Sequence, residues 1–122
     1  LINLMSIKIT KLNYSLDRIN SIALGNPEAI ARFNRLFIEQ TIEIDLPTLK
    51  QSAVDKNWKS VAEIAHKMKP SLDIYKITDG LEIIEELAKT NVSPSDEEHW
   101  LQKIECLVSE LAEVKIGLQS TL

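Results

Sequence analysis

Apolar residues recur every three or four positions along most of the chain, and this spacing constrains the fold more than any other feature of the sequence. The longest series ends the chain and consists of Trp100, Leu101, Ile104, Leu107, Val108, Leu111 and Leu118. Because this period places its members on one face of an α-helix, it predicts a long amphipathic last helix. Three glycines and four prolines in 122 residues are too few for a turn-rich β architecture.

Turn and cap residues divide the first half of the chain into helices. We expect a short first helix from Ser15 to Leu24 that ends at Gly25. A second helix should start near Pro27, with Asn26 as its N-cap. Its apolar face is predicted to hold Ile30, Phe33, Phe37 and Ile44. Beyond Pro47 the pattern resumes with Leu49 and Val54, so this helix is either bent or broken at the proline.

The second half of the chain continues in the same way. A third helix is expected from Asn57 to Lys76, and a turn from Thr90 to Pro94. Asp79, with Glu82 three residues later, resembles a capping box. It would open a fourth helix with Leu81, Ile84, Leu87 and Ala88 on one face. Both Ser93-Pro94 and Ser95 to Glu98 are typical of the start of the last helix.

Four substantial amphipathic helices with short connections predict an all-α fold. The simplest arrangement is an antiparallel up-down four-helix bundle with a short extra N-terminal helix. A chain of 122 residues has room for one domain of ordinary size. We expect an N-terminal extension over residues 1–13 and the helical bundle over residues 14–122.

Charge and composition exclude several classes of function. The net charge is −4, which gives no field to attract nucleic acid, and no apolar run is long enough to span a membrane. The single cysteine, Cys106, can form no disulfide within the chain, and the first residues lack the pattern of a secretory signal. We therefore expect a cytoplasmic protein that contacts neither nucleic acid nor membrane.

One residue of the third helix stands outside the apolar pattern. At about 100° per residue, His66 lies opposite the apolar side of this helix. That side consists of Val61, Ile64, Met68, Leu72 and Tyr75. The residues around His66 are small or charged, namely Lys59, Ala62, Glu63, Lys69, Pro70 and Asp73. The pattern predicts an imidazole exposed to water, with Trp58 and Ile74 partly exposed at the border of this face. For Trp58, packing at the edge of the core is an equally good expectation.

The segment His66-Lys67-Met68-Lys69-Pro70-Ser71 resembles the H-x-x-K-G-[SA] signature of histidine-containing phosphotransfer domains, and Ala65 precedes it as in many members. The resemblance extends from about Tyr14 to Ala88. It includes Phe33 and Phe37 before the motif, the join at Asp55 to Trp58, and Leu81 to Leu87 after it. Pro70 departs from the family pattern, which has glycine at this position.

The resemblance implies a phosphorelay step on His66. This residue would take a phosphoryl group from an aspartyl phosphate of a response-regulator receiver domain, or from a sensor or hybrid histidine kinase, and pass it to an aspartate of another receiver. The chemistry agrees, because an imidazole with an ordinary pKa of about 6.5 has a nucleophilic lone pair at neutral pH. Lys69 would offer its charge to the phosphoryl oxygens. Partner docking would involve Lys59, Ala62, Glu63, Pro70 and Asp73.

Other features of the sequence limit the reactions that the chain can carry out alone. The chain has no glycine-rich phosphate loop and no outward cluster of acids for a metal, so we expect a phosphotransfer protein without kinase activity of its own. It would need no cofactor and no metal site, because the divalent ion would be bound by the receiver. Pro70 cannot donate to the carbonyl of His66 and should cause a kink or a lost helical bond there. We expect Ser71 to pack at the edge of the core. Glu63 and Asp73 should be solvated, and any ion pairs that they form with Lys59 or Lys69 should be weak.

Two alternatives remain open at this point. Glu63 and His66 have the Glu-x-x-His spacing of di-iron bundles, and residues 96–99 offer an imperfect second copy. This alternative requires inward ligands, whereas both residues fall on the outward side. The other alternative is a helical interaction module that binds partners without accepting phosphate. His99 is most simply a surface residue, and Cys106 lies opposite the apolar stripe of the last helix.

Overall fold

The computed structural model describes residues 14–89 and 94–122, and the part of the chain that it describes is all-helical, without strands. The predicted extension over residues 1–13 and most of the predicted turn from Thr90 to Pro94 lie outside the described residues. The elements are α2 (Asp17–Ile22), α3 (Pro27–Leu36), a π-helix η1 (Phe37–Asp45), α4 (Leu46–Val54), α5 (Trp58–Ile74), α6 (Thr78–Lys89), a 3₁₀-helix η2 (Pro94–Asp96) and α7 (Glu97–Gln119).

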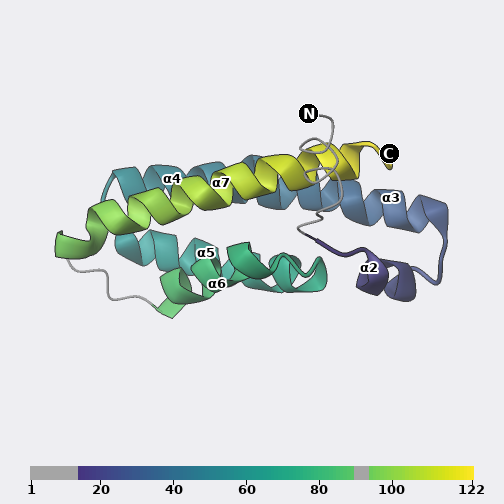
Figure 1. Cartoon of the computed structure of the whole chain (residues 1–122), viewed down its shortest axis with the longest axis horizontal. Coiled ribbons are helices and arrows are strands. Elements are labelled where there is room, and N and C mark those ends of the chain that lie inside the picture. The colour runs from purple at the N-terminus through teal and green to yellow at the C-terminus, as the bar shows by residue number, and fades with distance from the viewer. Residues whose placement is uncertain (1–13, 90–93) are drawn as a thin grey trace, which may run out of the picture.

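The helices pack side by side along the length of the molecule. The elements α3, η1 and α4 follow one another as one long rod, and α7 lies against this rod (Figure 1). α5 packs against α6, η1 and α4, while α6 also contacts α7. The short helix α2 lies near one end and contacts α3 (Figure 1). The core includes the fully buried Leu49, Val61, Met68, Leu72, Ile84, Leu87, Ile104, Leu107, Leu111 and Leu118.

The cap of the second helix forms as predicted. The side-chain oxygen of Asn26 accepts hydrogen bonds from the backbone N–H groups of Glu28 at 2.9 Å and Ala29 at 3.1 Å, so α3 begins at Pro27. The first helix is shorter than the predicted span, because Leu24 and Gly25 both have positive φ angles of 54° and 73°. This left-handed backbone ends the helical repeat and turns the chain toward α3.

Of the bend or break predicted at Pro47, the break does not occur, because the chain stays helical from Pro27 to Val54 and changes helix type before the proline. In the π-helix each bond spans five residues instead of four, and the wider turn shifts which side chains face the core. Ile44, predicted to lie on the apolar face, is 53% exposed. The core face of this region instead holds Phe37, Ile38, Thr41, Ile42, Asp45 and Leu46.

The remaining helices follow the predictions closely, apart from one cap. Asn57 caps α5 by accepting a hydrogen bond from the Ser60 N–H at 3.3 Å, and the helix ends two residues before the predicted Lys76. α6 begins at Thr78, so Asp79 lies within its first turn and the predicted capping box at Asp79 was wrong. None of the described helices is both long and apolar enough to cross a membrane.

Candidate functional site

His66 is exposed near the middle of α5, on the side away from the core. The opposite side of this helix is fully buried through Val61, Ala65, Met68 and Leu72. Among the described residues, His66 has no hydrogen-bond or ion-pair partner. The buried side holds α5 against its neighbours, so the exposed imidazole stands on a packed helix.

Two lysines flank His66 around the helix, and each pairs with an acid on a different neighbouring helix. Lys67 Nζ lies 3.2 Å from Asp45 Oδ1 on η1. Lys69 Nζ lies 3.5 Å from Glu85 Oε2 on α6. At about 100° per residue the two lysines are on opposite sides of His66. The histidine therefore lies between two cations that are tied to the helices on either side of α5.

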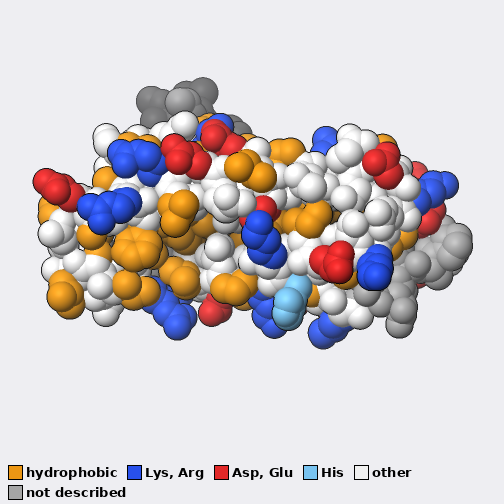
Figure 2. Space-filling model, turned by 180° about the vertical axis from the view of Figure 1, so that it is seen from behind, with side chains coloured by type: hydrophobic (Ala, Val, Ile, Leu, Met, Phe, Trp, Pro, Cys, Tyr) orange, Lys and Arg blue, Asp and Glu red, His pale blue; other side chains and the backbone are white. Residues whose placement is uncertain are grey.

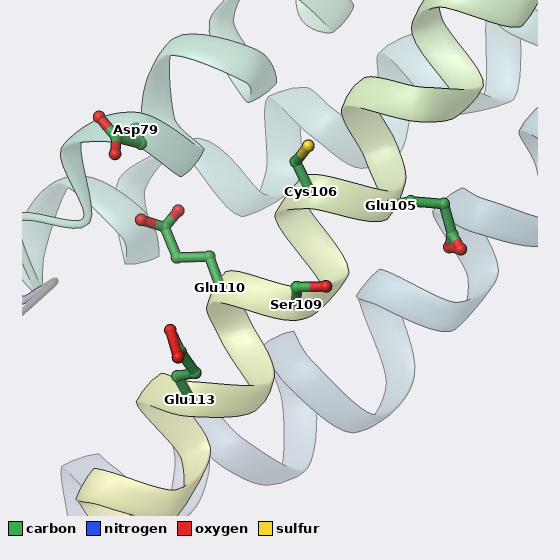
Figure 3. A pocket seen from close by; sticks show the side chains of 6 residues that line it. All are labelled: Asp79, Glu105, Cys106, Ser109, Glu110 and Glu113. Atoms are coloured by element: carbon green, nitrogen blue, oxygen red, sulfur yellow. The ribbon is translucent and has the colours of Figure 1, made fainter. Parts of the chain in front are cut away.

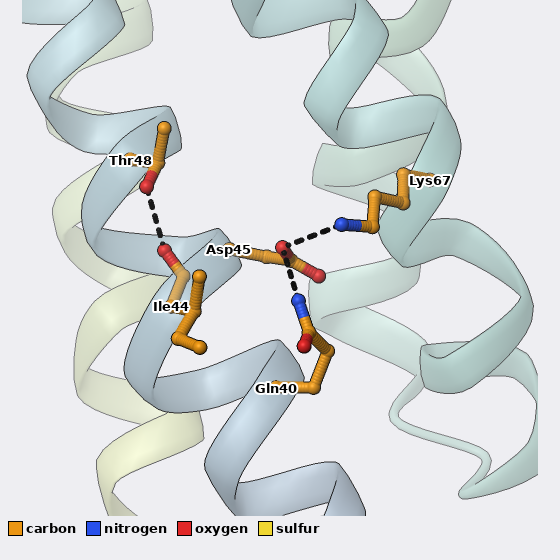
Figure 4. A network of polar contacts seen from close by, with 5 residues as sticks. All are labelled: Gln40, Ile44, Asp45, Thr48 and Lys67. Carbon is orange, nitrogen blue, oxygen red and sulfur yellow. Dashed lines mark hydrogen bonds and ion pairs between the residues drawn. The ribbon is translucent and has the colours of Figure 1, made fainter.

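Asp45 is an unusual partner because its side chain is only 8% exposed. Its Oδ1 atom accepts a second hydrogen bond, from Gln40 Nε2 at 3.1 Å (Figure 4). Burial of a carboxylate is costly unless the charge is paired, and here Lys67 reaches across from α5 to pair with it (Figure 4). Sequence reasoning missed Asp45, because helical spacing alone places Ile44 inward instead.

The other predicted residues of this face lie where expected, but their ion pairs differ. Lys59, Glu63, Pro70 and Asp73 are exposed, and Ala62 is half-buried. Asp73 pairs with Arg18 of α2 at 3.6 Å rather than with a lysine of α5. Because these residues are at the surface, they are accessible to a partner.

Pro70 lies inside α5, which continues to Ile74 without an interruption. Proline has no N–H, so the carbonyl of His66 lacks its usual helical donor four residues on. The predicted loss of a bond thus falls on His66 itself, and it does not end the helix.

An apolar groove runs along the same side of the molecule, between α2, the α3–η1 segment and the end of α5. Its volume is about 290 Å³, and its lining residues are Ile19, Phe33, Leu36, Phe37, Gln40, Thr41, Ser71, Ile74 and Tyr75. Figure 2 shows hydrophobic side chains gathered toward the end that carries α2 and α3, with a histidine beside Lys or Arg side chains farther along. Gln40 joins the two regions, because it lines the groove and also binds Asp45.

Two residues at the border of the His66 face are partly exposed, as predicted. Ile74 and Trp58 are both half-buried. The indole Nε1 of Trp58 donates to Glu97 Oε2 at 3.0 Å, which ties the start of α5 to the start of α7. Trp58 is thus a residue at the edge of the core that also links two helices.

A second groove, between α6 and α7, is acidic and was not anticipated from the sequence. It has a volume of about 450 Å³ and is lined by Asp79, Glu105, Cys106, Ser109, Glu110 and Glu113 (Figure 3). Burial raises the pKa of Glu110, and the nearby charges of Asp79 and Glu113 raise it further. A hydrogen bond from the Gly80 N–H acts in the other direction. Gly80 permits this approach, since a Cβ there would lie 2.7 Å from Glu110 Oε1.

The described residues contain no group of three or more His, Cys, Asp or Glu side chains that could hold a metal ion. The di-iron alternative therefore has no ligand cluster in this part of the chain. His99 is exposed, and its ring stacks edge-on against Trp100 with centroids 5.3 Å apart. Cys106 is exposed on α7. Neither residue lies in a constellation that suggests catalysis.

Comparison with protein-family models, with curated proteins and with solved structures gave no match.

Proposed function

We propose that the protein is a phosphorelay intermediate that accepts a phosphoryl group on His66 and passes it to or from an aspartate of a response-regulator receiver domain. The observation that carries the proposal is an exposed imidazole without described partners on a packed helix, with a paired lysine on either side. The proposal includes the antiparallel up-down four-helix bundle as its scaffold. It also includes a cytoplasmic location, where receivers and histidine kinases are found.

The chemistry requires little from this protein beyond presentation of the nucleophile. A ring nitrogen of His66 attacks the phosphorus of the receiver's aspartyl phosphate, the P–O bond to the carboxylate breaks, and the carboxylate leaves. The proton of the other ring nitrogen is then lost to solvent. Transfer of this kind depends on alignment and on neutralising the phosphoryl oxygens. Lys69 supplies a charge on this side, and the receiver supplies the divalent ion.

The apolar groove beside the His66 face is a suitable contact for the receiver. Exposed apolar residues such as Phe33 and Leu36 line it, while charged residues surround the histidine. An apolar contact next to a polar, accessible nucleophile suits a partner that must bind, exchange a group and leave. Lys59, Ala62, Glu63, Pro70 and Asp73 form the rest of the proposed docking surface.

The test is transfer of labelled phosphate from a phosphorylated receiver to the purified protein. We expect an acid-labile, base-stable label that is absent in His66→Gln. His99→Gln is the matched control, because it removes the other histidine and should leave the label unchanged. A label that persists in His66→Gln would overturn the assignment.

Two other outcomes would redirect the proposal. Receiver binding without any label would favour the phosphate-independent interaction module. Stoichiometric iron or zinc in the purified protein would favour the metal-binding alternative.

A further inference from the structure

The two lysines beside His66 differ in the kind of acid that holds them. Lys67 pairs with Asp45, whose side chain is 8% exposed and whose Oδ1 atom also binds Gln40. Lys69 pairs with Glu85, whose side chain is 41% exposed, across a longer distance of 3.5 Å. One pair is therefore fixed at a buried carboxylate, and the other is an ordinary surface pair.

This difference decides which lysine can change partners. If Lys67 left Asp45, a buried carboxylate would keep only the neutral amide of Gln40, and an uncompensated buried charge is strongly unfavourable. If Lys69 left Glu85, the half-buried carboxylate, which already contacts water, would be rehydrated at little cost. A phosphoryl group on His66 can therefore take Lys69 from Glu85 far more easily than it can take Lys67 from Asp45.

We propose, building on the function above, that Asp45 withholds Lys67 from the phosphoryl group and that Glu85 competes with the phosphoryl group for Lys69. Glu85 then sets how strongly the phosphorylated state is stabilised, although it touches neither the histidine nor the phosphate. Asp45 and Glu85 are positioning residues, which act through the lysines that they hold.

The test needs phosphohistidine but not the receiver. Phosphoramidate is the probe: a ring nitrogen of His66 attacks phosphorus, the P–N bond breaks, and ammonia leaves with the ring proton as ammonium. His99→Gln serves as the background, so that one imidazole is labelled. The readout is the pKa of the phosphoryl group, followed by ³¹P NMR during a pH titration at low salt. A nearby cation lowers this pKa and a nearby anion raises it, so the readout follows the charges around the phosphoryl group.

Glu85→Gln and its matched control Glu82→Gln, at an exposed residue of the same helix, test the competition. We expect Lys69→Ala to raise the phosphoryl pKa. Glu85→Gln should lower the phosphoryl pKa. We expect the acid dissociation constant of the phosphoryl group to change by about two- to fivefold, as is typical for the release of a surface ion pair. In the Lys69→Ala background Glu85→Gln should have almost no effect. An equal effect with and without Lys69 would show that Glu85 acts only as a remote charge and would overturn the competition.

Asp45→Asn and Lys67→Ala test the withheld lysine. Lys67→Ala should raise the phosphoryl pKa much less than Lys69→Ala, because Lys67 is held by Asp45 and does not serve the phosphate. Asp45→Asn in the Lys69→Ala background should lower the raised pKa again, because Lys67 is then released, and this drop should largely disappear when Lys67→Ala is added, since loss of the Asp45 charge alone acts only from a distance. The other charges of this face, namely Lys59, Glu63 and the Asp73–Arg18 pair, are the same in every variant. Circular dichroism checks that each variant folds.

The results separate this inference from the proposed function. A pKa that rises in Lys67→Ala as much as in Lys69→Ala, or no recovery with Asp45→Asn, overturns the role of Asp45. If the receiver never labels His66 but the chemically phosphorylated protein follows the pattern above, the relay proposal fails and the assignment of the two lysines stands.

Discussion

The His66 face and the acidic groove both gather carboxylates, but they arrange them differently. On the His66 face Asp45 and Glu85 each pair with a lysine, so the acids hold cations beside an exposed imidazole. In the groove between α6 and α7, Glu105 pairs with Lys50 at 2.9 Å, but burial and then the charges of Asp79 and Glu113 oppose the ionisation of Glu110. The comparison teaches that the number of charges does not identify a functional site. The two regions differ in what the charges surround, because only on the His66 face do ion pairs place lysines on both sides of an exposed imidazole.

The largest expected effect separates the two regions by chemistry. His66→Gln should abolish phosphoryl acceptance from a phosphorylated receiver, whereas Glu110→Gln should leave acceptance unchanged, because the groove takes no part in it. Labelling of both variants under the same conditions measures this. Loss of label in Glu110→Gln with an intact fold would mean that the acidic groove belongs to the site after all.

A second prediction concerns the backbone beneath the His66 face. Pro70→Ala should raise the free energy of unfolding by about 1–3 kcal/mol, because it restores a helical hydrogen bond at the His66 carbonyl inside α5. Pro27→Ala, at the first position of α3, is the matched control and should give no gain, since proline suits a helix start. Urea unfolding measures both. No gain in Pro70→Ala would show that α5 accommodates the proline without cost.

A third prediction concerns the buried polar groups near the end of α5. Tyr75 Oη donates to Asn34 Oδ1 at 2.9 Å, and Asn34 Nδ2 donates to Thr121 Oγ1 at 3.0 Å. Tyr75→Phe should lower the free energy of unfolding by about 1–3 kcal/mol, because it leaves the fully buried Asn34 oxygen without its donor. Thermal unfolding measures the loss. Tyr14→Phe is the control and should change much less, because Tyr14 is only half-buried.

The smallest effect is expected in the acidic groove and depends on pH. The folded-state pKa of Glu110 is raised, so its contribution to stability is full below the ordinary pKa of about 4.3 and is lost as the pH rises through the raised value. Glu110→Gln should therefore stabilise the protein at pH 7, by less than about 1 kcal/mol because the site is partly open to solvent. The gain should vanish near pH 4.

Unfolding curves at both pH values measure this difference. Glu39→Gln, at an exposed glutamate of η1, should show no such dependence. An equal gain at pH 7 and pH 4 would exclude ionisation of Glu110 as its cause.

Several parts of the fold could be predicted because they depend on local spacing and caps. The start of α3 follows from the Asn26 side chain and Pro27, and the exposure of His66 follows from its position opposite Met68 and Leu72 on one helix. The prediction for Ile44 was wrong because it assumed an α-helical repeat through η1. Propensity and spacing do not distinguish a π-helix from an α-helix, so the buried position of Asp45 was not visible in the sequence.

The sequence by itself determined the helical fold class, the face of α5 on which His66 lies, and the motif that suggests phosphoryl transfer. These properties depend on residues within a few turns of one another along the chain. Only the tertiary structure decided that Lys67 belongs to Asp45, Lys69 to Glu85, and that an apolar groove lies beside them. Each of these contacts joins different helices, and their packing depends on the whole core rather than on any local pattern.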